Sequence, residues 1–275
     1  MASHRQYYRD FRDHLKALEE RGKLVRIQRE INKDTELMPL VRWQFRGLDE
    51  RERKAFLFEN VVDSKGRRYT MPVTVGTLAA TTEIYAIGMM CAPDEIAERW
   101  TQAQLNPIEP VQVAAAPAQE IVRQGAELRN GHGLDMIPVP ISTPGFDNAP
   151  YLTSANWITK DLETGIYNIG NYRSQIKAAD RTGGLFTSQH MGQHWRKCKA
   201  NGKRLEACIA IGVIPSIAYA ATAKIPYDFD EYRLAGGLAG APVEVVQAKT
   251  VDLLVPATAE IIIEGTIPTD VVEPE

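Results

Sequence analysis

The first part of the chain alternates between hydrophobic residues at helical spacing and short hydrophobic runs. An amphipathic helix is predicted between a capping box at Ser3 and Gln6 and a C-cap at Gly22. Its hydrophobic side consists of residues three or four positions apart: Tyr8, Phe11, Leu15 and Leu18. The runs that follow predict strands at 23–27, 55–59 and 71–75 and helices at 85–90 and 93–104.

The second part begins with a segment, 137–151, that is too rich in proline and turn-forming residues for regular structure. A hairpin is predicted next, with strands at 152–159 and 166–173 around a turn at Asp161–Gly165. A short strand at 184–187 is expected to lead into a helix at 190–199. The remaining pattern predicts strands at 208–214, 243–248, 253–255 and 261–264, and helices at 216–223 and 231–238.

These elements predict an α/β protein in two parts. The alanine- and proline-containing segment 111–118 has the character of a connection, so we expect an N-terminal α/β domain over 1–118 and a second domain over 119–275. Residues 271–275 form neither a helix cap nor a completed strand. We therefore expect the chain to be part of a longer polypeptide.

Composition narrows the class of protein. The chain has 275 residues, with 32 basic and 35 acidic side chains and a net charge of −3, so nothing favours nucleic acid or an anionic membrane as partner. The longest uncharged apolar run, 207–223, is shorter than a membrane span of roughly 20 residues and contains proline. Three cysteines without metal-type spacing, and no apolar leader, predict a reduced, cytoplasmic setting.

Polar residues in three segments of the second part predict a site for a hard cation. Asn168 lies in the second hairpin strand, His190 where a strand passes into a helix, and Glu231 at a helix start. Amide oxygen, imidazole nitrogen and carboxylate together suit Mn²⁺ or Mg²⁺ better than a soft metal. Three ligands leave the coordination shell open, so we expect an outside group such as a phosphate to complete it. Arg173 lies close by in sequence.

Simpler interpretations of the same residues remain open. Asn168 and Arg173 are five positions apart, so they point to opposite faces of a strand unless the chain turns or bulges at Gly170. His190 could cap its helix or lie in the core, and Glu231 could favour the helix dipole. Asp228 and Asp230 are interpreted as solvated loop carboxylates, and the glycines of 236–240 as permitting close packing.

A second metal hypothesis uses His190 and His194, which share a helix face four residues apart. The pair is similar to the ligands of zinc hydrolases. However, the sequence His-Met-Gly-Gln-His lacks the glutamate that would serve as general base after the first histidine. A hydrolase of this kind would act with zinc alone.

Taken together, the segments resemble the UbiD family of reversible decarboxylases, which use prenylated FMN. The resemblance covers essentially the whole chain, and its most specific stretch is Val255-Pro-Ala-Thr-Ala-Glu-Ile-Ile-Ile-Glu-Gly-Thr266. The other matching motifs, in the family's order, are Phe11-Arg-Asp-His-Leu with Gly22-Lys-Leu-Val-Arg26, Pro138-Val-Pro to Pro150-Tyr-Leu-Thr153, and Asp230-Glu-Tyr with Ala235-Gly236.

The resemblance implies a role for each matching residue. Asn168, His190 and Glu231 would hold a divalent ion, Mn²⁺ or Mg²⁺, against the cofactor phosphate. A neighbouring K⁺ would be held by backbone carbonyls, with Ile169, Ala220, Ala221 and Ala223 at the matching positions. The flavin's tail and ring would be lined by Gly170, Asn171, Tyr172, Gln189 and Thr222. Arg173 matches the catalytic arginine and would orient the substrate carboxylate, and Glu275 matches the first glutamate of the family's catalytic motif.

The resemblance also implies an overall function. We expect reversible decarboxylation of an aromatic, heteroaromatic or α,β-unsaturated acid, on a flavin-reductase-like split β-barrel flanked by the N-terminal α/β portion. A flavin prenyltransferase would supply the cofactor, and the full-length form would be a homo-oligomer. The family's second glutamate and its C-terminal oligomerisation region have no counterpart in the sequence. The alternative is a flavin- and metal-binding subunit without turnover.

Overall fold

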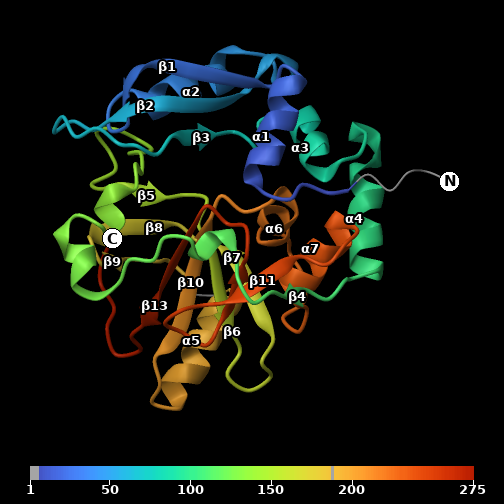
Figure 1. The fold of residues 1–275 in the computed structure, drawn as a ribbon, viewed down its shortest axis with the longest axis vertical. Coiled ribbons are helices and arrows are strands. Elements are labelled where there is room, and N and C mark those ends of the chain that lie inside the picture. The colour runs from blue at the N-terminus through green and yellow to red at the C-terminus, as the bar shows by residue number, and fades with distance from the viewer. Residues whose placement is uncertain (1–5, 187–188) are drawn as a thin grey trace.

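The N-terminal part is a small three-stranded sheet with helices around it. The computed structural model describes residues 6–186 and 189–275. Strands β1 (Leu24–Asn32) and β2 (Ala55–Val62) pair in parallel, and β3 (Val73–Val75) pairs antiparallel to β2. In Figure 1 this sheet forms the upper layer. The helices of this part are α1 (Phe11–Glu20), α2 (Leu37–Gly47), α3 (Thr82–Met89) and α4 (Ile96–Leu105), with 3₁₀ turns η1 (Glu50–Glu52) and η2 (Pro93–Glu95).

Helix α1 begins later than predicted. Asp10 is its N-cap, and its side chain accepts a hydrogen bond from the backbone N–H of Asp13 at 2.8 Å, so the helix starts at Phe11 and Tyr8 precedes it. The predicted capping residue Ser3 lies outside the described residues. At its other end the C-cap is Arg21, one residue before the predicted Gly22, and Gly22 follows the cap with a φ of +66°.

The second part is built on a four-stranded sheet in the order β13-β10-β6-β7. All of its neighbouring strands are antiparallel, and β6 with β7 forms the predicted hairpin. Helix α5 (His190–Ala200) lies beside the lower end of this sheet in Figure 1. The bounds of its strands are β6 (Asn156–Lys160), β7 (Tyr167–Asn171), β10 (Leu205–Ile211) and β13 (Ile261–Ile267).

Two further three-stranded sheets complete the second part, in the orders β12-β11-β4 and β5-β8-β9. Their strands are β4 (Val111–Gln112), β5 (Tyr151–Leu152), β8 (Ser174–Ala178), β9 (Arg181–Thr182), β11 (Glu244–Gln247) and β12 (Leu254–Pro256). The remaining helices are α6 (Pro215–Ala220) and α7 (Glu231–Ala239), with 3₁₀ turns η3 (Pro117–Gln119), η4 (Gly125–Asn130) and η5 (Leu134–Met136). The α/β class is confirmed, while the strands of 6–186 and 189–275 form no closed barrel.

Some local predictions were wrong. Residues 184–186 are not a strand, and Thr187 of that prediction lies outside the described residues. The segment 111–118, expected to be only a connection, contains β4, which pairs in parallel with β11. Helix α2 was not predicted, and neither were β8 and β9. The boundary at residue 118 stays a prediction.

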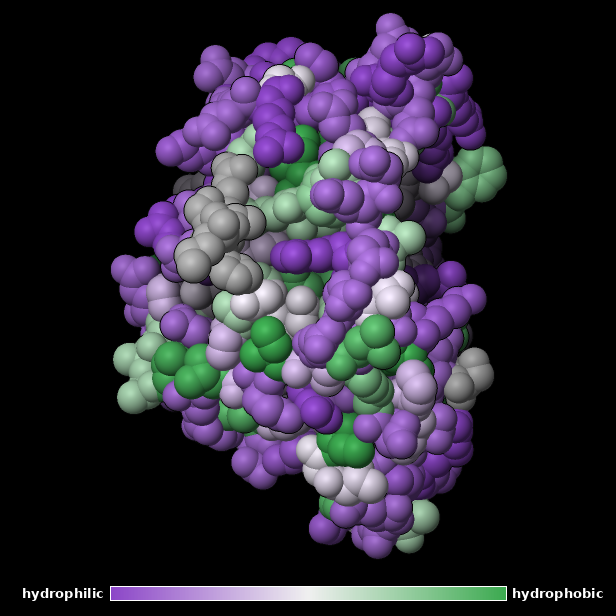
Figure 2. All heavy atoms as spheres, turned by 90° about the vertical axis from the view of Figure 1, so that its right-hand side faces the viewer, coloured by the Kyte–Doolittle hydropathy of each residue, from purple (hydrophilic) through white to green (hydrophobic). Residues whose placement is uncertain are grey.

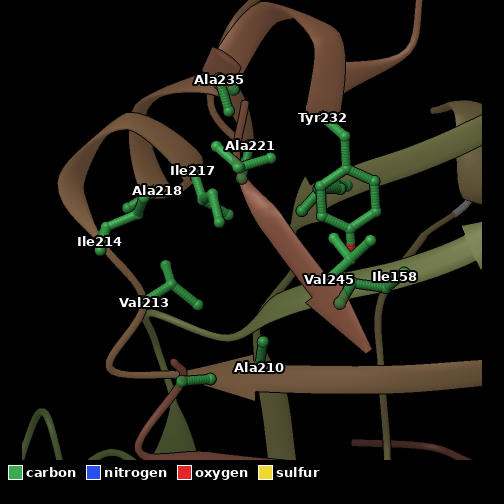
Figure 3. Packing of buried hydrophobic residues seen from close by; sticks show 14 of the residues in the cluster. Ile158, Ala210, Val213, Ile214, Ile217, Ala218, Ala221, Tyr232, Ala235 and Val245 are labelled. Carbon is green, nitrogen blue, oxygen red and sulfur yellow. The ribbon is translucent and has the colours of Figure 1, made fainter. Parts of the chain in front are cut away.

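The largest core cluster holds α6 and α7 against the strands. Figure 3 shows Ile217 and Ala221 of the α6 region, Ala235 and Tyr232 of α7, and Val245 of β11 directed toward a common interior. The Tyr232 side chain is 1% exposed and its hydroxyl donates to the carbonyl oxygen of Leu254 at 2.9 Å, so its polar atom is satisfied. This core fixes the start of α7, where Glu231 lies.

Glycines in α7 allow it to pack closely on α4 and on the chain that follows α4. A Cβ atom built on Gly236 would lie 2.4 Å from the carbonyl oxygen of Ile108, and one on Gly237 would lie 2.6 Å from that of Ala103. Gly240 ends the helix with a φ of +70°. The interpretation of these glycines as packing residues, rather than as a nucleotide loop, is confirmed.

The surface in Figure 2 is mostly hydrophilic, with hydrophobic residues in separate small groups. Such scattered apolar residues are normal on a globular protein. Within residues 6–186 and 189–275, no helix has both the length and the apolar character needed to cross a membrane.

Candidate active site

Glu231 is a buried carboxylate attached to strand β7. It is the first residue of α7, is 3% exposed, and its Oε2 accepts a hydrogen bond from the backbone N–H of Ile169 at 3.0 Å. Burial raises the pKa of Glu231 to about 8, against the lowering effect of the Ile169 N–H. No lysine or arginine in the described part of the chain forms an ion pair with it. A buried carboxylate of this kind requires a cation or a proton.

Asp230 is not the solvated carboxylate that was predicted. It is the N-cap of α7, and its side chain accepts from the backbone N–H of Tyr232 at 2.7 Å. Burial raises the pKa of Asp230. Asp228, in contrast, is exposed as expected. The cap sets the direction in which α7 presents Glu231.

His190 is the first residue of α5 and faces Glu231. Its Nδ1 lies 4.0 Å from Oε1 of Glu231, and its side chain is 26% exposed. Burial lowers the pKa of His190, which favours the neutral imidazole that binds metals. The Tyr227 ring packs edge-on against the imidazole, with the ring centroids 5.2 Å apart.

Asn168 brings the amide of the predicted ligand set to the same region. It is 4% exposed on β7 and directly precedes Ile169, the residue bonded to Glu231. Its Nδ2 is buried without a hydrogen-bond partner. If the amide turned over about its terminal bond, its oxygen would take that place and could accept a cation.

This donor set fits a hard divalent cation. Two ligand bonds of about 2.1 Å can span up to about 4.2 Å, so one ion could bridge the 4.0 Å gap between His190 Nδ1 and Glu231 Oε1. In the part of the chain that the structure describes, no group of three or more His, Cys, Asp or Glu side chains could hold a metal. A metal site at His190 and Glu231 would therefore have to take the amide of Asn168 as a third ligand.

Arg173 and Glu275 form a bidentate ion pair just beyond the end of β7. Arg173 Nε donates to Glu275 Oε1 at 3.1 Å, and Nη2 donates to Oε2. The Arg173 side chain is 56% exposed, and the glutamate raises its pKa. Strand β7 pairs regularly with β6 from 167 to 171, so there is no bulge at Gly170. Arg173 instead lies outside the strand.

Residues expected around a flavin lie on or directly beside β7, α5 and α6. Gly170 and Tyr172 are buried, whereas Asn171, Gln189 and Thr222 are exposed. The backbone N–H of Asn171 donates to the Ala221 carbonyl oxygen at 3.1 Å, which joins β7 to the end of α6. Among the expected K⁺ ligands, the carbonyl oxygen of Ala220 accepts from the N–H of Ala223 at 3.1 Å, and that of Ala221 from Asn171. Each of these two carbonyl oxygens retains one lone pair for a cation.

A buried polar network under His190 was not foreseen from the sequence. Asp161 is 2% exposed and accepts hydrogen bonds from Lys197 Nζ at 2.7 Å and from the Tyr227 hydroxyl. His194 Nδ1 shares a hydrogen bond with Thr159 Oγ1 at 2.9 Å, and burial lowers the His194 pKa to about 4. His194 belongs to this network because its Nε2 lies 3.7 Å from Asp161 Oδ2. The described residues supply no third zinc ligand for the hydrolase hypothesis.

Comparison with protein families decides the class. The model of the 3-octaprenyl-4-hydroxybenzoate carboxy-lyase Rift-related domain, UbiD, matches residues 109–275. The model of the N-terminal domain of the same carboxy-lyases matches residues 15–104. The chain belongs to the UbiD family. The resemblance seen in the sequence is thereby confirmed.

Relatives and solved structures agree with UbiD membership. Phenolic acid decarboxylase from Bacillus subtilis is 31% identical over 94% of this chain and 54% of its own length. The UbiD-class enzyme HmfF from Pelotomaculum thermopropionicum, solved with FMN, has a TM-score of 0.83 at 33% identity, covering 94% of this chain and 55% of that one. Vanillic acid decarboxylase from Sedimentibacter hydroxybenzoicus has a TM-score of 0.84 at 25% identity, covering 95% and 55%. The chain thus spans about half the length of the relatives it matches.

Proposed function

We propose that the protein carries out reversible, non-oxidative decarboxylation of an aromatic, heteroaromatic or α,β-unsaturated carboxylic acid, with prenylated FMN, Mn²⁺ and K⁺. The observation that carries the proposal is the buried Glu231 carboxylate, which lies 4.0 Å from His190 Nδ1 and is bonded to the residue after Asn168. Membership of the UbiD family and the FMN present in the HmfF structure support the choice of cofactor.

The proposed cofactor site lies at the ends of four elements, β7, α5, α6 and α7. Asn168, His190 and Glu231 would hold the divalent ion against the flavin phosphate, and the carbonyl groups of 169, 220, 221 and 223 would hold K⁺. The lining residues would be Gly170, Asn171, Tyr172, Gln189 and Thr222. When bound, the prenylated flavin would supply an electron sink for the carbon that loses CO₂. Two cations beside one phosphate would offset its charge.

Arg173 would bind the substrate carboxylate. Its guanidinium presents planar pairs of donors that match a carboxylate; Glu275 accepts from Nε and Nη2, which leaves the edge that carries Nη1 for the substrate. Glu275 would therefore set the orientation of the guanidinium and could take up or release a proton near it. The partners we propose are the acid and CO₂, a flavin prenyltransferase, and further copies of the chain. Three free cysteines within the described residues support a cytoplasmic setting.

The test is reconstitution with prenylated FMN, Mn²⁺ and K⁺, followed by measurement of CO₂ release from a panel of acids and of H/D exchange at the corresponding C–H of their decarboxylated products. Arg173→Ala should abolish CO₂ release. Arg12→Ala is the matched control, because Arg12 forms a comparable two-bond pair with Glu260, at 2.7 Å for each bond. An unchanged rate in Arg173→Ala would refute the assigned role. Bound flavin with no CO₂ release from any of the acids and no exchange in their products would favour the alternative, a flavin- and metal-binding subunit.

A further inference from the structure

Asp161 occupies the turn between β6 and β7 but is buried like a core residue. Its Oδ1 accepts hydrogen bonds from the backbone N–H groups of Glu163 at 2.8 Å and Thr164 at 3.1 Å. Its Oδ2 accepts from Lys197 Nζ at 2.7 Å and from the Tyr227 hydroxyl. A turn needs only the first pair of bonds, which an exposed aspartate would also make. The second pair needs another explanation.

The partners of Asp161 come from the same three segments that carry the proposed metal ligands. Asp161 itself begins the turn that leads into β7, where Asn168 lies. Lys197 is on α5, the helix that His190 begins. Tyr227 is in the short connection that leads to Glu231 at the start of α7. One carboxylate therefore joins all three ligand-bearing segments.

Tyr227 connects Asp161 to His190. Its hydroxyl is held by Asp161, and its ring lies edge-on to His190 at 5.2 Å and 84°, and to His194 at 5.7 Å and 76°. The Lys197 ammonium lies 5.3 Å from the centroid of the same ring. The Tyr227 ring is thus held through its hydroxyl and through one face, and this holds it in position against the His190 imidazole.

We propose that Asp161 and Tyr227 are positioning residues that hold His190, and the segments of Asn168 and Glu231, in the geometry that binds the divalent cation. The proposal rests on the proposed function. Residues that orient metal ligands typically contribute 10–100-fold to metal affinity. A buried, charged network is also a costly way to gain stability alone, which favours a role in geometry.

The experiment measures Mn²⁺ affinity in the presence of FMN, by electron paramagnetic resonance of free Mn²⁺, together with Tm. Tyr227→Phe keeps the ring against His190 and removes only its hydroxyl. We expect it to weaken Mn²⁺ binding about tenfold with little change in Tm. Asp161→Asn, which keeps the shape, should weaken binding further. The control is Asp252→Asn, which breaks another Lys–Asp bond at the end of β6, Lys160 Nζ to Asp252 Oδ2 at 2.8 Å.

The outcomes separate the two proposals. If Tyr227→Phe and Asp161→Asn lower Tm but bind Mn²⁺ as tightly as the unchanged protein, the network is merely structural and the inference is overturned. If His190→Ala weakens Mn²⁺ binding while Tyr227→Phe does not, the metal site stands and only the positioning role fails. If the unchanged protein and His190→Ala show the same lack of binding, the metal site itself is refuted, and the inference with it.

Discussion

The backbone N–H of Ile169 donates to Oε2 of Glu231 at 3.0 Å, so a single buried bond joins β7 to the first residue of α7. The bond fixes one carboxylate oxygen on the strand and leaves Oε1 directed toward His190, 4.0 Å from its Nδ1. One oxygen is thus structural and the other remains available for a ligand. This division of roles makes the two functions of Glu231 separable by mutation.

Glu231→Gln should preserve the fold but lose the metal. The glutamine amide oxygen can still accept from Ile169, so we expect the free energy of unfolding without metal to change by less than about 1 kcal/mol. Glu231→Ala leaves that buried N–H unpaired and creates a cavity, which should cost about 2–4 kcal/mol. Urea denaturation in EDTA compares the two. Equal losses in both variants would contradict the division of roles.

Gly170→Ala should disturb the site through Tyr172. A Cβ atom on Gly170 would lie 2.3 Å from Tyr172 Cε2, so the buried tyrosine ring must move. We expect a loss of about 1–3 kcal/mol in unfolding free energy and weaker flavin binding, measured by denaturation and by flavin fluorescence. Gly265→Ala is the matched control, because it is also in a strand but its Cβ would meet nothing within 4 Å. Similar effects of both substitutions would show that the close approach to Tyr172 does not matter.

His14 should make the protein sensitive to acid. Its ring is buried, with Nε2 2.7 Å from the Thr77 carbonyl oxygen, and burial lowers its pKa to about 4 from an ordinary value near 6.5. The folded state therefore favours the neutral ring. The stability that this contributes is present above about pH 6.5 and is lost as the pH falls toward 4, by at most about 3 kcal/mol.

The measurement for His14 is urea denaturation at several values between pH 4 and pH 7. His14→Gln, which does not titrate, should have a flatter stability profile across this range. His132→Gln removes an imidazole at an exposed position and serves as the control. A profile for His14→Gln as steep as that of the unchanged protein would assign the acid sensitivity to other groups.

The sequence was sufficient for elements with a strong local signal. The β6–β7 hairpin follows from alternation around a turn, and α7 from the glycine that ends it, Gly240. Helix α2 was missed because Pro39 lies in its first turn, where a proline is easily taken for a helix break, and because the large hydrophobic residue Trp43 is 74% exposed on its outer side. Strands as short as β9 pair through tertiary contacts rather than through any local pattern.

The residues of the candidate site also differ in how far the local sequence reveals them. Asn168, His190 and Glu231 could be proposed because their side chains form a recognisable set of hard-cation ligands. Asp161 was predicted only as a turn residue, since its bonds to Lys197 and Tyr227 span 36 and 66 positions in sequence. Nothing local distinguishes a buried turn aspartate from an exposed one. The supporting network therefore appears only once the three segments are placed together.

Arg173→Ala should leave the fold intact, so that loss of activity can be assigned to chemistry. The Arg173–Glu275 pair is bidentate, but the arginine side chain is 56% exposed, and exposed ion pairs contribute about 0–1 kcal/mol. We expect the unfolding free energy of Arg173→Ala to lie within about 1 kcal/mol of the unchanged protein, and Arg12→Ala to behave alike. Urea denaturation provides the comparison. A loss of several kcal/mol in Arg173→Ala alone would mean that the pair with Glu275 holds the structure together, and an inactive variant could then no longer be interpreted as a missing substrate contact.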